Sequence, residues 1–207
     1  MIDYLIISDT HFGSGRFKRY KEVCDLISTT EAKKIIFNGD IFETSSLVES
    51  KKKFPEFFSI IENKDYVFIQ GNHDRWADIE SVKINIDDKR VIVLHGHQVD
   101  MVIPLLQDIS VWLNELSMKI LRCDVQGLWR RFFEKIMPNG IKMLPMLYRN
   151  RCRLIDQHSE HYDIIISGHI HYTEVFHENS FTYYTASIMD ANSFITIKDS
   201  KIILHKF

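Results

Sequence analysis

Short apolar runs recur along the chain, and each has the length of a β-strand. The pattern predicts eight strands, at residues 4–7, 34–37, 66–69, 91–94, 163–166, 181–184, 193–197 and 201–205. Apolar residues at helical spacing predict helices at 20–28 and, after the basic start "KKK", at 54–62. Strands that alternate with helices indicate an α/β layered fold with buried strands. The last two strands meet at Asp199-Ser200, which predicts an antiparallel hairpin.

Polar residues of one chemical kind follow each of the first five predicted strands. They are Asp9-Thr10-His11, Gly39-Asp40, Gly71-Asn72-His73-Asp74, His95-Gly96-His97 and Gly168-His169-Ile170-His171. Any one of these groups is also typical of an ordinary turn, because Gly, Asn, Asp and His are common there. In open α/β sheets, however, ligands bind beyond the carboxyl ends of the strands. Five strand ends with the same ligand chemistry therefore predict a metal site.

The donor types narrow the choice of metal. Carboxylate, imidazole and amide donors without a thiolate suit Mn, Fe, Co or Zn better than Ca or a structural zinc. The candidate donors outnumber the positions around one ion, which favours two divalent ions that share a carboxylate. We expect Mn²⁺ first, with Fe, Zn, Co or Mg as the other compatible ions.

The order of these motifs resembles the calcineurin-like metallophosphoesterase superfamily. The matching segments are "DTH" (9–11), "GDIFE" (39–43), "GNHD" (71–74), "HGH" (95–97) and "GHIH" (168–171). The resemblance implies a four-layer α/β/β/α sandwich and a single metallophosphoesterase domain over residues 1–207. Residues 101–160 lie outside the motifs and are expected to form a helical cap inserted into that domain.

The resemblance also implies which residues bind the two ions. The first ion would be held by Asp9, His11, Asp40 and His171, and the second by Asp40, Asn72, His95 and His169. Asp40 would bridge them, and a hydroxide shared between the ions would attack phosphorus. The chain would then be a hydrolase of the phosphodiesterase or pyrophosphatase type.

The segment around His73 is expected to carry the proton chemistry. His73 is placed to donate a proton or hydrogen bond to the phosphoryl or leaving oxygen, and Asp74 to orient its imidazole. Glu43 stands where many members of the superfamily have Asp. It either hydrogen-bonds a residue of the site without binding the metal itself, or it is a surface residue on the following turn. Arg75 and His97 are candidate substrate contacts.

Two further segments bear on the substrate. "HGHQVD" (95–100) and the closing "YYTASIMDANSFITI" are similar to the UDP-2,3-diacylglucosamine hydrolase-like branch, which favours a diester or pyrophosphate over a monoester. The ending departs at Thr185 and Ala186, and His73 stands where some such hydrolases have Arg. "GDIFETS" lacks the Arg that follows this motif in the protein Ser/Thr phosphatases, so that branch is not expected.

Charge is concentrated in the expected cap. Residues 119–153 contain nine basic and two acidic residues, a local charge of +7 in a chain whose net charge is −2. The plain interpretation is a helical cap that packs on the core and has a solvated basic side. The alternative is a lid whose Arg130 and Arg131 bind an anionic, partly apolar substrate or a membrane surface. A basic lid of this kind also suits nucleic acid.

Three function classes follow from these observations. The first is the metal-dependent phosphohydrolase, the second a nuclease acting on DNA or RNA, and the third a non-catalytic metal-binding scaffold for another protein. All seven ligand positions and His73 are present, which favours an enzyme. Three scattered cysteines, no leader-like start and no apolar run of membrane-spanning length predict a cytoplasmic protein, peripheral to a membrane at most.

Overall fold

The structure is a computed structural model that describes residues 1–15, 18–44, 46–99, 145–178 and 181–207. The chain forms two compact units, one of Met1–Gln98 with Ile155–Phe207 and the other of Val99–Leu154. Most of the predicted cap at 101–160 lies outside the described residues. From it the structure describes helix α6 (Pro145–His158) and the chain that follows. No helix among the described residues has both the length and the apolar character needed to cross a membrane.

The first sheet brings the N-terminal strands together with the two C-terminal ones. It contains β1 (Ile2–Ile7), β2 (Ala32–Asn38), β3 (Tyr66–Ile69), β9 (Ser193–Lys198) and β10 (Lys201–Lys206), in the order β10-β9-β1-β2-β3. Strands β1, β2 and β3 run parallel, and β9 pairs antiparallel with β1. The predicted hairpin of β9 and β10 is confirmed. Its turn residues Asp199 and Ser200 have φ values of 47° and 62°, as a two-residue turn of this hand requires.

The second sheet has two strands that the sequence analysis did not predict. It contains β4 (Ser81–Ile86), β5 (Lys89–Leu94), β6 (Ile164–Ser167), β7 (Glu174–Glu178) and β8 (Phe181–Thr185), in the order β4-β5-β6-β8-β7. Strands β4 and β7 are the unpredicted ones, and both lie at edges of the sheet. Strand β4 alternates Val82, Ile84 and Ile86 with polar residues, a pattern that does indicate a half-buried strand. Strand β7 is largely exposed and carries no such signal.

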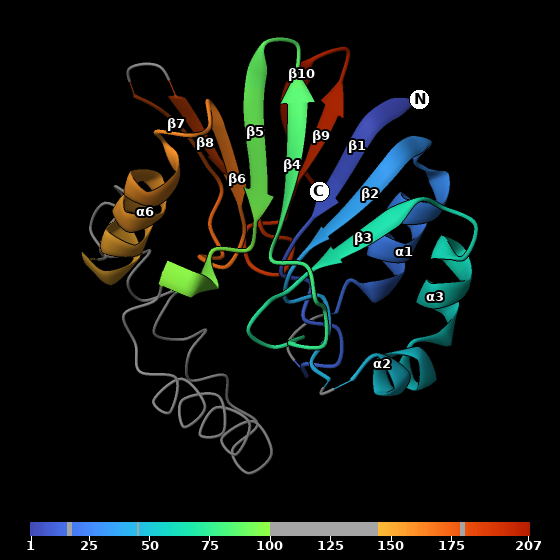
Figure 1. The fold of residues 1–207 in the computed structure, drawn as a ribbon. Helices are drawn as coiled ribbons and strands as arrows, with labels where there is room; N and C mark the ends of the chain where they lie inside the picture. The colour runs from blue at the N-terminus through green and yellow to red at the C-terminus, as the bar shows by residue number, and fades with distance from the viewer. Residues whose placement is uncertain (16–17, 45, 100–144, 179–180) are drawn as a thin grey trace. The chain divides into compact units, whose positions relative to one another are not determined.

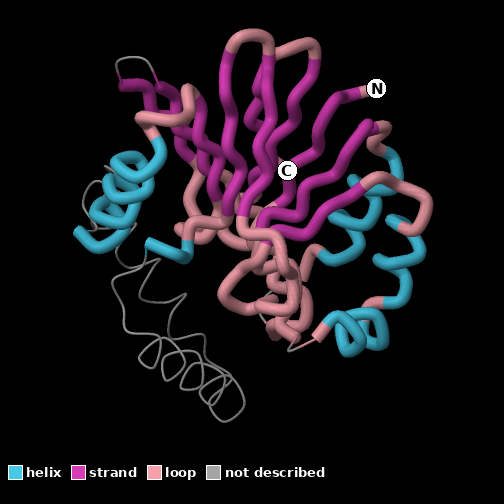
Figure 2. The backbone as a smooth tube through the Cα atoms, viewed as in Figure 1, coloured by secondary structure: helices cyan, strands magenta, loops and turns pink. Residues whose placement is uncertain are grey.

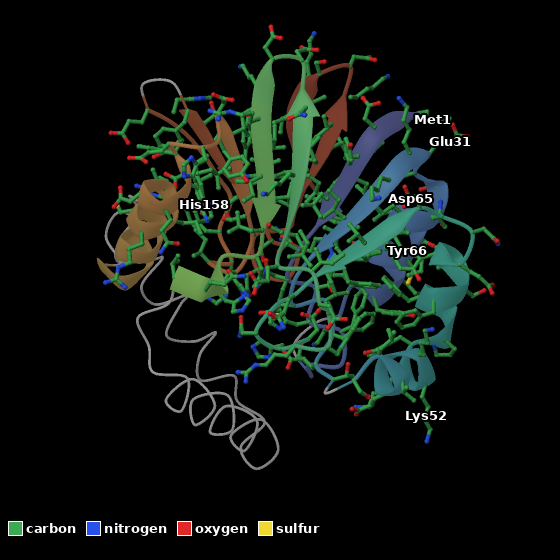
Figure 3. All side chains as sticks on the ribbon, viewed as in Figure 1. Met1, Glu31, Lys52, Asp65, Tyr66 and His158 are labelled. Carbon is green, nitrogen blue, oxygen red and sulfur yellow. The ribbon has the colours of Figure 1, made fainter. Side chains whose placement is uncertain are left out.

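Three helices belong to the same unit as the two sheets. They are α1 (Tyr20–Thr29), α2 (Leu47–Lys53) and α3 (Pro55–Ile61), and a single 3-10 turn, η1, spans His97–Val99. The helix predicted at 54–62 is α3, but the three lysines before it end α2 and do not start α3. Basic residues are favourable at a helix C-terminus, whereas Pro55 suits the first turn of the next helix. Lys52, labelled in Figure 3, projects from this basic end of α2.

Two apolar layers hold this unit together. Ile6, Ile36, Val93 and Ile166 belong to a cluster of isoleucine and valine that packs the two sheets face to face. A second cluster, rich in phenylalanine, packs α1 and α3 on the outer face of the first sheet. Figures 1 and 2 show the helices on that face and the strands of both sheets in layers. The predicted α/β sandwich of two sheets flanked by helices is therefore confirmed.

Candidate metal centre

The loops after five strands bring the predicted ligands together. Asp9, His11 and His171 form one group whose donor atoms all lie within 4.8 Å of one another. Asp40, His95 and His169 form a second group by the same distance, and His11 and Asp40 join His73 in a third. We call the first group the first metal position and the second group the second metal position. The three groups contain six of the seven ligands that the resemblance implies, together with His73.

The backbone at these loops is locally strained. Five of the nine described non-glycine residues with positive φ are predicted ligands, with φ between 47° and 64°. They are Asp9, His11, Asp40, His169 and His171. Asp and His tolerate this left-handed region better than most residues, at a cost of about 1–3 kcal/mol each. Such strain concentrates at functional sites, where it aims side chains that regular structure would turn away.

Two glycines allow the sheets to approach at the site. A Cβ atom on Gly39, after β2, would lie 2.4 Å from the His95 ring. A Cβ atom on Gly168, after β6, would lie 1.8 Å from Ser8 Oγ. Each glycine comes directly before a predicted ligand, and each touches the opposite sheet. Only glycine leaves room for this contact.

The first metal position has donor atoms at spacings that suit one ion. His171 Nε2 lies 3.1 Å from His11 Nε2 and 3.3 Å from Asp9 Oδ1. Ligands about 2.1 Å from an ion lie roughly 3.0–3.4 Å apart at octahedral or tetrahedral angles. Two imidazole nitrogens this close, beside a buried carboxylate, are what a metal ion would hold together. The residues therefore fit a divalent ion.

Carboxylates lie behind both imidazoles of the first metal position. His11 Nδ1–H donates to Glu43 Oε1 at 2.6 Å, and His171 Nδ1–H donates to Asp190 Oδ2. Burial opposes protonation of His171, but Asp9 and Asp190 outweigh it and raise its pKa to about 10. These contacts leave each Nε2 directed at the metal position, the usual arrangement for a metal-binding histidine.

At the second metal position, His95 is held by a neutral group. His95 is fully buried, and its Nδ1–H donates to the backbone carbonyl of Asn38 at 2.8 Å. Its Nε2 lies 3.3 Å from Asp40 Oδ2. Asn72 Oδ1 is buried and has no hydrogen-bond partner among the described residues. A buried oxygen without a donor is costly unless a cation or water meets it, so Asn72 also fits as a ligand.

Asp40 lies between the two metal positions. Its Oδ2 is 3.3 Å from His95 Nε2 and 3.8 Å from His11 Nε2, while its Oδ1 accepts the His73 backbone N–H at 2.9 Å. Burial favours the neutral acid, but the facing imidazoles hold the pKa of Asp40 well below its usual range. A permanently charged carboxylate within reach of both groups is what a bridging ligand must provide.

The partner of His73 differs from the prediction. His73 Nδ1–H donates to Glu43 Oε2 at 2.7 Å, so Glu43 holds both His11 and His73 and is no ordinary surface residue. Asp74 does not orient His73. Its carboxylate accepts the backbone N–H groups of Gly71, Asp40 and Ile41 at 2.8–3.0 Å. Used in this way, the Asp74 carboxylate ties two loops together.

The charges near His73 follow from these contacts. Burial disfavours the imidazolium, but Asp40 and Glu43 outweigh it and raise the pKa of His73 to about 9. Burial also opposes ionisation of Glu43, yet its two histidine partners lower its pKa to about 2. For Asp74, burial and then the Asp40 charge raise the pKa to about 6.

The predicted substrate contacts fall partly within the described chain. Arg75 is exposed, and its Nε–H donates to the backbone carbonyl of Asn72, a predicted ligand, at 3.0 Å. The His97 ring centroid lies 5.4 Å from that of His95 and 6.3 Å from that of His169, so it lies close to the same position. Arg130 and Arg131 lie outside the described residues.

Sequence reasoning missed Asp190, which lies in the loop between β8 and β9. No motif marks it, because a lone Asp in "IMDAN" has the same appearance as a surface residue. The loop is nevertheless fixed at the site, since Ile188 and Met189 donate backbone N–H groups to the carbonyls of Ser8 and Asp9, each at 3.0 Å.

The sandwich and the ligand groups at its strand ends define the metallophosphoesterase class. Residues 2–173 match the calcineurin-like phosphoesterase family, and the chain belongs to this family. Membership supports a phosphoesterase-type hydrolase that binds divalent metal. Among curated protein sequences, no match is found.

Several solved structures share the fold at low sequence identity. Vps29 of Chaetomium thermophilum is 10% identical, with a TM-score of 0.52, covering 98% of this chain and 85% of that one. A single mutant of Vps29 from Entamoeba histolytica is 17% identical, with a TM-score of 0.51 and coverages of 97% and 89%. A Thermotoga maritima protein solved by NMR is 14% identical, with a TM-score of 0.52 and coverages of 99% and 98%. At these identities the likeness shows the fold alone.

Proposed function

We propose that the chain hydrolyses a phosphodiester or pyrophosphate bond with two divalent metal ions, Mn²⁺ in preference. The observation that carries this proposal is the position of Asp40, whose Oδ2 reaches toward His95 Nε2 at 3.3 Å and His11 Nε2 at 3.8 Å. One anionic carboxylate that serves two groups of imidazoles is the donor arrangement of two-metal hydrolases.

The ions, when bound, would lower the pKa of a water molecule and polarise the phosphoryl oxygens. The chain's own residues prepare that chemistry. Glu43, Asp190 and the Asn38 carbonyl each hold one ligand imidazole by its Nδ1–H. These contacts fix the tautomer of the three imidazoles and the direction of their Nε2 atoms before substrate binds. Preorganisation of this kind lowers the free-energy cost of reaching the transition state.

His73 is the proposed proton donor. Because its Nδ1–H is held by Glu43, the Nε2–H is the ring donor that remains for a substrate oxygen. The raised pKa of His73, about 9, keeps the ring protonated at neutral pH in the metal-free protein. A protonated imidazole beside the metal positions can stabilise the phosphoryl oxygens or protonate the leaving oxygen.

Arg75, His97 and the segment 95–100 bear on the substrate class. Arg75 is anchored beside Asn72, so its guanidinium suits a second anionic group such as the other phosphate of a pyrophosphate. The similarity of residues 95–100 to UDP-2,3-diacylglucosamine hydrolases makes nucleotide-linked lipids the natural substrates to assay after a model diester. His97, near His95 and His169, is a further candidate contact.

The test is hydrolysis of bis-p-nitrophenyl phosphate and of the monoester by chelator-stripped protein, with and without added Mn²⁺. We expect turnover of the diester only with metal. His73→Asn should retain ion binding and lose about 10²–10⁴-fold in turnover, the usual contribution of a positioned acid. His177→Asn is the matched control, because His177 is exposed and pairs only locally with Thr182.

Other outcomes separate the alternatives. Preference for the monoester would replace the diesterase assignment with a phosphatase. Cleavage of DNA or RNA with a steep loss at higher salt would identify a nuclease. Bound metal with no turnover of any of these substrates would favour the protein-binding scaffold.

A further inference from the structure

Helix α2 carries apolar side chains on its exposed face. Val48 is 78% exposed and Leu47 is 37% exposed, whereas Ser50 on the other side of the helix is fully buried. Of the large hydrophobic residues in the described part of the chain, Val48 has the highest exposed fraction. Burial of an aliphatic side chain away from water is favourable, so a surface that covered Val48 and Leu47 would gain binding free energy.

Lysines share this exposed face. Lys51 and Lys52 lie three and four positions after Val48, and residues at this spacing are neighbours on the surface of a helix. Both lysines are exposed, and neither forms an ion pair within the described residues, whereas Lys53 pairs with Glu49 at 2.6 Å. Lys52 projects away from the two sheets in Figure 3. The exposed face of α2 therefore combines apolar surface with positive charge.

Polar contacts on the buried side fix the orientation of α2. The Ser50 hydroxyl donates to the Ser46 backbone carbonyl at 3.0 Å, and its oxygen also shares a hydrogen bond with the Thr44 hydroxyl. Val48 and Lys52 are each two positions from Ser50, which places them about 160–200° around the helix axis from it. Because Ser50 is held inside, these two side chains are held outside.

Helix α2 also lies beside the candidate metal centre. Phe54 ends the helix, and its Cζ lies 3.4 Å from the position that a Cβ atom on Gly13 would take. The Cβ of Glu43, the partner of His11 and His73, lies 3.7 Å from the same position. Figure 1 shows α2 at the end of the sandwich where the loops after β1, β2 and β3 lie. A surface in contact with α2 would therefore lie close to the metal positions.

The start of α1 adds positive charge next to α2. Tyr20, the first residue of α1, packs on Phe54, with 5.7 Å between the ring centroids. Lys18 and Lys21, on either side of Tyr20 in the sequence, are both exposed. Glu56, at the start of α3, is also exposed and is one acid against the four exposed lysines of α1 and α2. The charge of this region suits an anionic partner.

We propose that helix α2 docks this chain on an anionic membrane surface. Leu47 and Val48 enter the headgroup layer, and the adjacent lysines meet lipid phosphates. Aliphatic side chains beside lysines on one helix face are what an interfacial helix presents to a bilayer. Nucleic acid would use the lysines but would gain little from exposed aliphatic side chains. The docking stands without the proposed function, but its consequence, that the hydrolysed phosphoester is carried on a lipid, rests on that function.

The test is flotation of the full-length chain with vesicles, in EDTA so that the metal positions take no part. One set is phosphatidylcholine alone, and the other is phosphatidylcholine and phosphatidylglycerol in equal parts. We expect binding to the anionic set. Val48→Ser should weaken it about tenfold, because less apolar surface is buried, and Val48→Trp should strengthen it. The double variant Lys51→Gln/Lys52→Gln should weaken it about 25-fold, at about fivefold for each lysine.

Matched controls remove the same groups elsewhere. Val175→Ser changes an exposed valine of β7, and Lys83→Gln/Lys89→Gln removes two exposed lysines of β4 and β5. Both controls should bind as the parent chain does. Equal binding to both vesicle sets, or α2 variants that bind like the parent chain, would overturn the proposal. Loss in the lysine variant with none in Val48→Ser would show a purely electrostatic contact, as with nucleic acid, and would overturn the membrane assignment.

A second assay separates the docking from the proposed function. With Mn²⁺ added, Lys51→Gln/Lys52→Gln should raise the KM for CDP-diacylglycerol in anionic vesicles and leave hydrolysis of bis-p-nitrophenyl phosphate unchanged. Flotation without hydrolysis of either substrate would leave the docking standing and remove the proposed function. Hydrolysis of the soluble diester without flotation would overturn the docking alone. An equal loss on both substrates would show that the variant disturbs the site itself and would overturn the lipid-borne substrate.

Discussion

The two sheets contribute different donors to one centre. The ends of β1, β2 and β3 in the first sheet supply the predicted oxygen ligands Asp9, Asp40 and Asn72, with His11 beside them. The ends of β5 and β6 in the second sheet supply only imidazoles: His95, His169 and His171. Neither sheet holds a complete set, so the centre forms only where the sheets pack. Metal binding should therefore report directly on that packing.

The largest effect is expected from removing the shared oxygen ligand. Asp40→Asn keeps the shape of the side chain but removes the charge that serves both metal positions. We expect loss of both ions and a fall in turnover of more than about 100-fold. Replacing a residue that only hydrogen-bonds a metal ligand already costs about 10–100-fold in metal affinity or activity. Ion counting by mass spectrometry of metals, beside the diester assay, measures both.

His95→Asn is the counterpart from the second sheet. His95 belongs to the second metal position only, so this variant should keep one tightly bound ion while turnover is lost. If both variants lost the same number of ions, the division of donors between the positions would be wrong. If neither lost an ion, these residues would not be ligands.

The next effect concerns the contact between the sheets. Gly168→Ala places a Cβ atom 1.8 Å from Ser8 Oγ, so β6 and β1 must separate locally. Overpacking of this severity costs about 3 kcal/mol, and displacement of Asp9 should weaken metal binding as well. Urea unfolding of the metal-free protein measures the first effect and Mn²⁺ titration the second.

Gly13→Ala provides the comparison for this glycine. Gly13 has a φ of 100°, but its Cβ would approach no atom more closely than 3.4 Å. The variant should therefore show backbone strain alone, on the order of 1 kcal/mol, and leave metal affinity nearly unchanged. A Gly168→Ala variant as mild as Gly13→Ala would mean that the sheets are not in close contact at this point.

The motifs of the predicted ligands are local in sequence, whereas the contacts that hold these residues are not. A predicted ligand such as His95 follows a recognisable strand. Its supporting contact is not local, because Asn38 lies 57 positions away in the other sheet. Asp74 was expected to hold His73 because it is adjacent in sequence, whereas the actual partner, Glu43, lies 30 positions earlier.

The same limit applies to the fold. The strands that the pattern predicted correctly are largely buried ones such as β1, β2, β5 and β6. Strand β7 is defined by its pairing with β8 and has little apolar character of its own, so periodicity could not find it. Burial generates the sequence signal, and an exposed edge strand such as β7, held mainly by backbone hydrogen bonds, lacks it.

The smallest effect is the pH dependence of the stability that metal confers. In the metal-free protein the pKa values of His73, His95 and His171 are raised to about 9, about 9 and about 10. Their stabilising contribution is fully present below the unfolded pKa of about 6.5 and is lost as pH rises through these values. Metal binding works in the opposite direction, because His95 and His171 must release protons to become ligands.

The difference in melting temperature between the Mn²⁺-loaded and the chelated protein should therefore widen from pH 6.5 to pH 9. Each proton displaced contributes up to about 1.4 kcal/mol per pH unit to the metal's effect. Asp74 and Glu43, with pKa values of about 6 and about 2, titrate below this window. Differential scanning calorimetry at constant free Mn²⁺ measures the difference.

In His95→Asn one imidazole of the second sheet is missing, so the widening of the melting-temperature difference should be smaller. An equal widening would mean that His95 is not among the groups that release protons on metal binding.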